Sequence, residues 1–170
     1  VFQPNDSVGI SVQMSAKLFA IMADEVLQAC GEDKGEEIVR RAVRRYAELR
    51  AAGIRKEILD AGKEVTFETV EELSDYPPND AWDCQTDISD KQLHGITYAC
   101  PFSTAFREIG LEYAGSLYCK EIDIALNEAF FGDIDFARPQ IFNTNDKGIC
   151  EMIVTRKAKT TYCKKERKSS

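Results

Sequence analysis

Two pairs of alternating segments most constrain how this chain can fold. Apolar and polar residues alternate over residues 82–88 and again over 92–100, with a short turn at Ser89-Asp90 between them. A second pair, residues 133–142 and 149–155, flanks a stretch that is dense in turn-forming residues. Such alternation is typical of strands with one buried face, and short connections favour antiparallel hairpins. We therefore predict four strands in two hairpins.

The remaining segments have helical spacing. Apolar residues recur every three or four positions from residue 15 to Gly31, from residue 33 onward, and over residues 101–109 and 111–130. Gly53 is expected to divide the second segment into two helices. The order is helices, a strand pair, two helices and a strand pair. It predicts an α+β fold, with helices packed on an antiparallel sheet of about four strands and an N-terminal helical layer.

Size and charge limit the domain organisation and the function classes. We expect one domain over residues 1–163, with a helical part (15–75) and a sheet part (81–160), then a disordered basic tail (164–170). The 22 Lys and Arg against 29 Asp and Glu give a net charge of −7, which argues against a nucleic-acid partner. We find no membrane-spanning run and no signal pattern, so we expect a cytoplasmic protein with reduced cysteines and no membrane partner.

Cys100 stands at a strand-to-helix corner. The next residue, Pro101, cannot extend a strand but suits the first position of a helix. A helix N-terminus lowers the pKa of a nearby thiol. Cys100 is therefore predicted to be an ionised nucleophile that reacts with iodoacetamide ahead of Cys30 and Cys163.

Cys119, Asp123 and Cys150 are the other candidate site residues. Cys119 and Asp123 are four residues apart, on one edge of the apolar face of the predicted helix 111–130. Apolar residues also occur on the opposite side of this helix, so we expect it to be covered from more than one direction. Asp123 is then a candidate for a perturbed pKa, or else a boundary carboxylate whose head lies in water. Cys150 shares a strand face with Met152, and this face is expected to meet the helices.

These motifs together resemble a known family. Cys-Pro-aromatic, then Cys-x-x-x-Asp in a helix, then a Gly- and Asp-bearing turn before a strand Cys is similar to the L-2-amino-thiazoline-4-carboxylic acid hydrolase family. The resemblance spans residues 95–155 and includes Cys100, Pro101, Cys119, Asp123 and Cys150. It implies an enzyme that opens a small cyclic amidine or thiazoline carboxylate at a C–N bond.

The roles that follow combine the resemblance with the chemistry of the residues. Cys100 is the expected nucleophile, Asp123 the acid and base, Cys119 a further catalytic residue and Cys150 a substrate-binding residue. We expect a small-molecule substrate and no cofactor, and a homo-oligomer stays open. Arg138 suits a substrate carboxylate, but an arginine on an edge strand is expected to be solvated.

Two alternatives remain open at this point. The chain is a non-catalytic sensory domain whose cysteines line a ligand or metal pocket, or the cysteines are core thiols. A zinc site would need Cys100, Cys119 and Cys150 with His94 or Asp123. Because the chain has no C-x-x-C and only one His, we predict no tightly bound metal. His94 shares the predicted strand face of Cys100, so it is a candidate for the same cavity.

Overall fold

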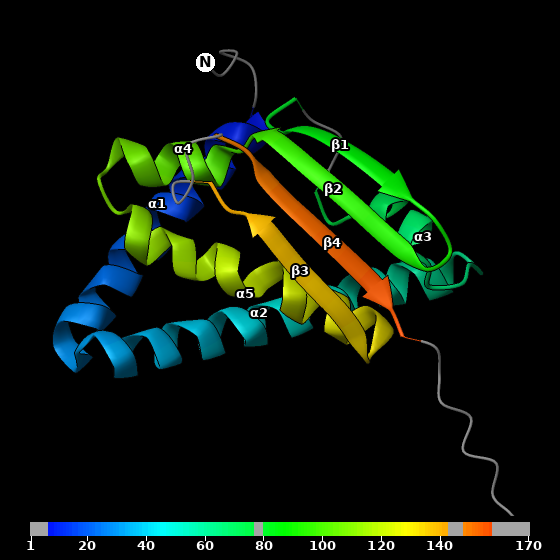
Figure 1. Cartoon of the computed structure of the whole chain (residues 1–170), viewed down its shortest axis with the longest axis horizontal. Coiled ribbons are helices and arrows are strands. Elements are labelled where there is room, and N and C mark those ends of the chain that lie inside the picture. Colours follow the sequence, from blue (N-terminus) through cyan, green and yellow to red (C-terminus); the bar gives the residue numbers. More distant parts are fainter. Residues whose placement is uncertain (1–6, 77–79, 143–147, 158–170) are drawn as a thin grey trace, which may run out of the picture.

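The computed structural model describes residues 7–76, 80–142 and 148–157, and Figure 1 shows the order of its elements. The helices are α1 (Ser7–Cys30), α2 (Glu32–Asp60), α3 (Phe67–Glu72), α4 (Pro101–Glu108) and α5 (Glu112–Phe131). The strands are β1 (Asp83–Ile88), β2 (Gln92–Ala99), β3 (Ile134–Gln140) and β4 (Cys150–Arg156). The predicted α+β class, four-stranded antiparallel sheet and N-terminal helical region are confirmed. The predicted tail, residues 164–170, lies outside the described residues.

The sheet consists of the two predicted hairpins joined through their second strands. Its order is β1-β2-β4-β3, and every neighbouring pair is antiparallel. Proline cannot donate a ladder hydrogen bond, so the sequence predicts that Pro139 lies on an edge strand or at a bulge. Both expectations are confirmed, since β3 is an edge strand and its register with β4 shifts between Ala137 and Gln140.

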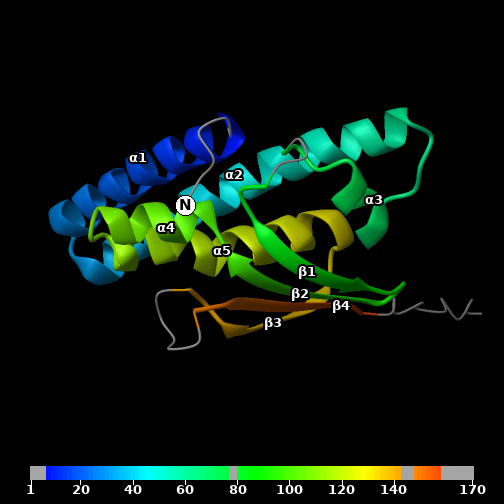
Figure 2. The same ribbon diagram turned by 90° about the horizontal axis from the view of Figure 1, so that it is seen from above.

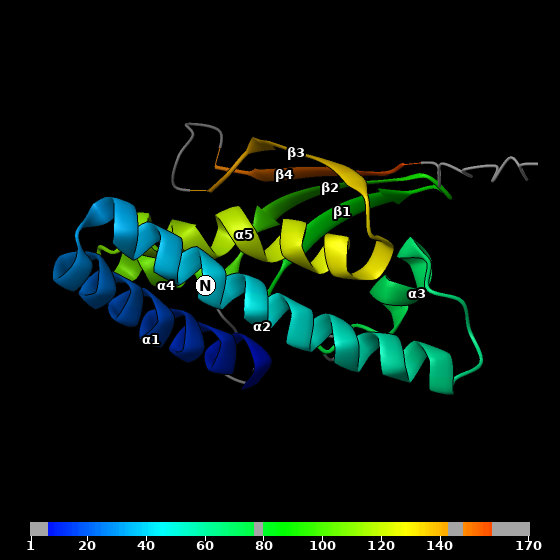
Figure 3. The ribbon, with the colours of Figure 1, turned by 90° about the horizontal axis from the view of Figure 1, so that it is seen from below.

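All helices lie on one side of this sheet. Figures 2 and 3 show α5 next to the sheet, with α2 and α1 farther away. The inward-facing residues Leu93 of β2 and Val154 of β4 are buried with Phe67 of α3 and Ile134 of β3. None of the helices in the described ranges is both long enough and apolar enough to cross a membrane. Because the helices cover one face of the sheet, side chains from both layers can line a common pocket between them.

The first helices are longer than predicted. Gly53 does not divide α2, which runs unbroken for 29 residues. Glycine inside a helix costs only about 1 kcal/mol relative to alanine. Here Ile54 and Ile58 on the same helix are buried against Phe130 of α5, and this packing outweighs the propensity. Likewise α1 is helical from Ser7, before the predicted start at residue 15.

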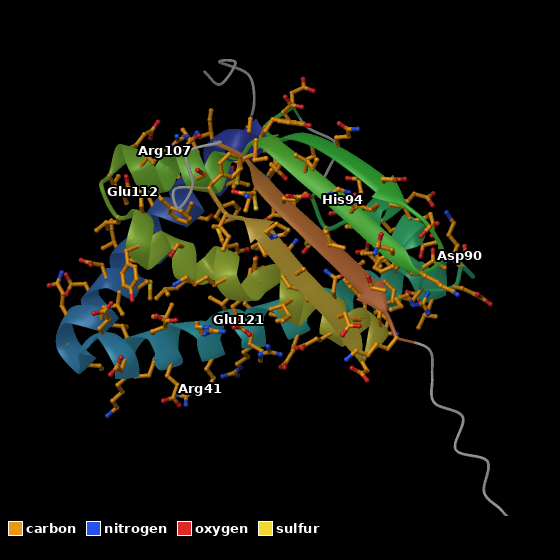
Figure 4. All side chains as sticks on the ribbon, viewed as in Figure 1. Arg41, Asp90, His94, Arg107, Glu112 and Glu121 are labelled. Atoms are coloured by element: carbon orange, nitrogen blue, oxygen red, sulfur yellow. The ribbon has the colours of Figure 1, made fainter. Side chains whose placement is uncertain are left out.

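The helix α5 is covered from two directions, as expected. One consequence was not foreseen: the side chain of Glu121, a charged residue of this helix, is only 5% exposed. Arg40 and Arg44 of α2 bind its two carboxylate oxygens, at 2.9 Å and 2.6 Å. Arg41, on the same helix, points into solvent (Figure 4). On the basic face of α2, Arg40 and Arg44 therefore bind α5, whereas Arg41 is solvated.

Candidate active site

A pocket of about 500 Å³ lies between the inner face of the sheet and the helices. Three structural elements bring the predicted site residues to its wall. Cys100 lies at the corner between β2 and α4, Cys119 and Asp123 come from α5, and Cys150 comes from β4. All four residues therefore line a single pocket, although their chemical roles remain predictions.

The spacing of α4 and α5 depends on one close approach. Phe106 of α4 is fully buried, and its ring lies directly against Gly115 of α5. A Cβ atom at position 115 would lie 2.3 Å from Cγ of Phe106, so only glycine fits there without a shift. This contact fixes the helix that begins after Cys100 against the helix that carries Cys119 and Asp123.

Arg138 is the main site residue that the sequence interpretation misplaced. Its side chain is 9% exposed, so the prediction of a solvated edge arginine is wrong. It forms an ion pair with the Asp123 carboxylate and donates a hydrogen bond to Cys150 Sγ at 3.3 Å. Its Nε is buried and has no hydrogen-bond partner among the described residues. Period-two alternation from Ile134 and Phe136 was the available signal, because it places position 138 on the inner face.

The environment of Cys100 acts against ionisation. Burial is the largest effect and raises the pKa of the thiol to about 11, while the backbone N–H groups of Ser103 and Phe102 act in the opposite direction. The helix N-terminus therefore has the expected sign, but desolvation outweighs it. Cys100 is therefore expected to be a protonated thiol near pH 7. The prediction of a resting thiolate is wrong.

Alkylation measures this directly. At pH 7.5 we expect iodoacetamide to modify Cys100 more slowly than the exposed Cys30, because the thiolate is the reacting species. The Cys100 rate should rise about tenfold per pH unit until the pH nears 11, since a raised pKa shifts the thiolate to higher pH. Peptide mass spectrometry after timed labelling gives both rates. Faster labelling of Cys100 than of Cys30 at pH 7.5 would contradict the burial argument.

The other two pocket thiols are also protonated at rest. Burial raises the pKa of Cys119 and of Cys150, and the positive charge of Arg138 opposes this at both residues. Cys30, Cys84, Cys100, Cys119 and Cys150 are all free thiols. In the described part of the chain, no three His, Cys, Asp or Glu side chains converge closely enough to hold a metal ion. Elemental analysis of the purified protein is the direct test for a metal.

His94 lies on the other face of the sheet, so the suggestion that it shares a cavity with Cys100 is wrong. Its Nε2 lies 2.9 Å from Oε1 of Glu151, on the outer face seen in Figure 4. In β2 the residues that line the pocket include Leu93, Gly95 and Thr97. The strand alternation ends at Ala99, and the chain turns at Cys100 into α4. The prediction extended the strand alternation across this corner to Cys100, and it therefore wrongly put His94 and Cys100 on the same face.

Part of the pocket wall comes from α2, from α3 and from the segment after α3, where the sequence predicted no site residue. Arg50 of α2 donates two hydrogen bonds to Asp75, at 2.7 Å and 2.5 Å, and lies over the ring of Tyr76. Glu71 of α3 also lines the pocket, and burial followed by the charge of Asp123 raises its pKa. The pocket is thus lined by two arginines, Arg50 and Arg138, and by two carboxylates, Glu71 and Asp123.

Comparison with known proteins supports the family resemblance predicted from the cysteine motifs. The sequence model of the L-2-amino-thiazoline-4-carboxylic acid hydrolase family matches residues 11–153. The chain belongs to this family. Its match extends beyond the cysteine motifs to α1 and α2, so the N-terminal helices are part of the family fold. The family's name denotes a hydrolase. Neither the curated proteins nor the solved structures yielded a match.

Proposed function

We propose that this pocket hydrolyses a small cyclic amidine that carries a carboxylate, opening a ring C–N bond. The observation that carries the proposal is the ion pair between Asp123 and the buried Arg138 within the pocket (the Asp123–Arg138 pair). The compound in the family's name, an amino-thiazoline carboxylic acid, contains one basic amidine group and one acidic group. Each group has an oppositely charged counterpart in the pair.

Substrate binding would exchange partners within the pair. The substrate carboxylate takes the place of Asp123 on the guanidinium of Arg138, a group that binds carboxylates in a planar, two-point manner. The amidine then binds the freed carboxylate of Asp123. The buried Nε of Arg138, which has no partner among the described residues, offers the carboxylate a further donor. The hydrogen bond from Arg138 to Cys150 Sγ keeps the guanidinium in place, and this is the substrate-binding role of Cys150.

The bound amidine would also activate Cys100. A positive charge close to a thiol favours the thiolate, so a protonated amidine lowers the free-energy cost of ionising the buried Cys100 thiol. Asp123 accepts the Cys100 proton, Sγ bonds to the amidine carbon, and the ring C–N bond breaks as the nitrogen takes that proton. Water then attacks the same carbon and displaces Cys100 as a thiol, so one water is consumed overall. Cys119, buried beside Cys100, helps to form the dehydrated wall of this step.

A non-catalytic small-ligand-binding domain is the second candidate. The observation that favours it is that burial raises the pKa of all three pocket thiols, which keeps them protonated near pH 7. Incubation with L-2-amino-thiazoline-4-carboxylate separates the two candidates. Hydrolysis gives a product heavier by one water in mass spectrometry, and Cys100→Ser should abolish its formation. Binding by calorimetry without any such product would support the sensory domain instead.

Arg138 provides a sharper test of the substrate class. We expect Arg138→Met to raise KM for the carboxylate substrate by about 10- to 100-fold, the scale of a lost charge-assisted hydrogen bond. The reaction of 2-amino-thiazoline without the carboxylate should change much less. The matched control is Arg156→Met, because Arg156 lies over the ring of Phe131 as Arg138 lies over Phe136, but it is not part of the pocket lining. Equal losses with both substrates would contradict a carboxylate-binding role.

A further inference from the structure

One helix face in this chain is apolar and exposed. On α1, the side of Val12, Ala16, Ala20 and Ala23 is buried. The opposite side carries five large apolar residues that are about half exposed or more, which we call the α1 stripe: Ile10, Met14, Leu18, Ile21 and Met22. Figure 3 shows that α1 lies on the side of the molecule farthest from the sheet. A contiguous apolar patch of this kind on a folded protein marks an interaction surface.

The stripe runs along the axis of α1, which suits a second helix as the partner. Exposed residues at alternating steps of four and three run along the centre of this face: Ser7, Ser11, Met14, Leu18, Ile21, Glu25 and Gln28. These steps average 3.5 residues, so the line stays on one side of the helix, where a second helix can pack alongside. The three central positions are apolar, and the ends are polar. From Ile10 to Met22 the stripe is about 18 Å long, or just over three turns.

We propose that a second copy of this chain docks on the α1 stripe, with the two α1 helices antiparallel about a two-fold axis near residue 16. In this arrangement Met14 of one copy faces Leu18 of the other, and Ile10 faces Met22. Ile21 faces Ser11, so four of the five apolar residues of the stripe are matched with one another in this self-complementary interface. The pocket between sheet and helices stays clear of this surface.

Charge decides the orientation. Glu25 lies on the same seam, one turn beyond Ile21, and is exposed. In the antiparallel pair it approaches Ser7 at the N-terminus of the other α1, where the helix dipole is positive. A parallel pair would instead place the two Glu25 carboxylates together. Lys17, at the margin of the stripe, already binds Glu108 of α4 at 2.7 Å, so it does not interrupt the apolar surface.

Sedimentation velocity over the micromolar range tests the proposal. The chain should show a monomer–dimer equilibrium, and Leu18→Glu should raise the dissociation constant at least about tenfold, because it places a charge in the apolar seam. The control is Leu59→Glu on α2, which makes the same change at similar exposure (57% against 60%) away from the stripe. It should leave the equilibrium unchanged. Circular dichroism should show both variants folded, since both positions are exposed.

A second variant tests the orientation. Glu25→Gln should weaken the dimer by roughly two- to fivefold, because it removes the charge beside the partner helix N-terminus. A stronger dimer in this variant would indicate parallel helices and overturn the antiparallel arrangement. A chain that stays monomeric throughout the concentration range, or a dimer that Leu18→Glu leaves intact, would overturn the proposal itself.

Discussion

Asp123→Asn is expected to lower turnover per folded molecule by about 100-fold or more, the usual scale for losing a general acid or base. The amide cannot accept the Cys100 proton, and it cannot pair with a positively charged amidine. The same change also removes the charge partner of the buried Arg138, so we expect the melting temperature to fall as well. Turnover therefore has to be divided by the folded fraction, measured at a temperature where both proteins are folded.

The control for this variant lies two residues earlier on the same helix. Glu121 is also a buried carboxylate held by arginines, but it faces α2 rather than the pocket. Glu121→Gln should cost about 1–3 kcal/mol of stability, because Arg40 and Arg44 lose a charged partner, and should leave turnover nearly unchanged. If both variants lose activity only in proportion to their stability, Asp123 is a structural residue. If Asp123→Asn is fully active, the acid and base must be sought elsewhere.

Gly115→Ala should be among the most destabilising single-methyl changes in the protein. The added Cβ would lie 2.3–2.5 Å from three ring atoms of the fully buried Phe106, so α4 and α5 must move apart. Overpacking of this kind costs about 3 kcal/mol at the upper end of its usual range. Chemical denaturation of parent and variant measures the difference. Because the same contact positions Cys100 against Asp123, turnover should fall even where the variant is folded.

Two further variants test whether the contact between Phe106 and position 115 causes the loss of stability in Gly115→Ala. Gly53→Ala, in the middle of α2 with no atom within 4 Å of the new Cβ, should stabilise the protein by up to about 1 kcal/mol through helix propensity. Phe106→Leu combined with Gly115→Ala should restore part of the lost stability, since the smaller side chain leaves room for the methyl group. A double variant no better than the sum of the single changes would place the strain outside the Phe106 contact.

The local features of the fold could be predicted from the sequence because they depend on near neighbours. Pro101 ends β2 and starts α4, the strand period identifies both hairpins, and Pro139 identifies an edge strand. What the sequence does not contain is how deeply a residue is buried by elements far along the chain. Glu121 and Arg138 look like surface charges in their own segments, and each becomes buried only because another element supplies the opposite charge.

The candidate site shows the same difference between local features, which the sequence predicts, and burial by distant elements, which it does not. The motif residues Cys100, Cys119, Asp123 and Cys150 were found by their local settings, and the fold places them in one pocket. The sign of the net pKa shift at Cys100 was not predictable, because a helix N-terminus is a local feature whereas desolvation depends on the whole pocket. Arg50 and Glu71 come from helices that carry no motif at all, so only the three-dimensional arrangement reveals them.

The unbroken helix α2 has a consequence for how small molecules reach and leave the pocket. Arg50 lies in the pocket wall, while Arg40 and Arg44 on the same rigid helix hold Glu121 of α5. This wall therefore cannot yield without disturbing the helical layer as a whole. The rim next to Arg50 includes Glu71 of the six-residue helix α3, together with Tyr76 and Trp82, whose rings contact each other. Arg50 holds this rim through Asp75 and Tyr76, so we expect a small molecule that enters on this side to disturb the contacts of a short helix and the segment after it rather than those between the long helices.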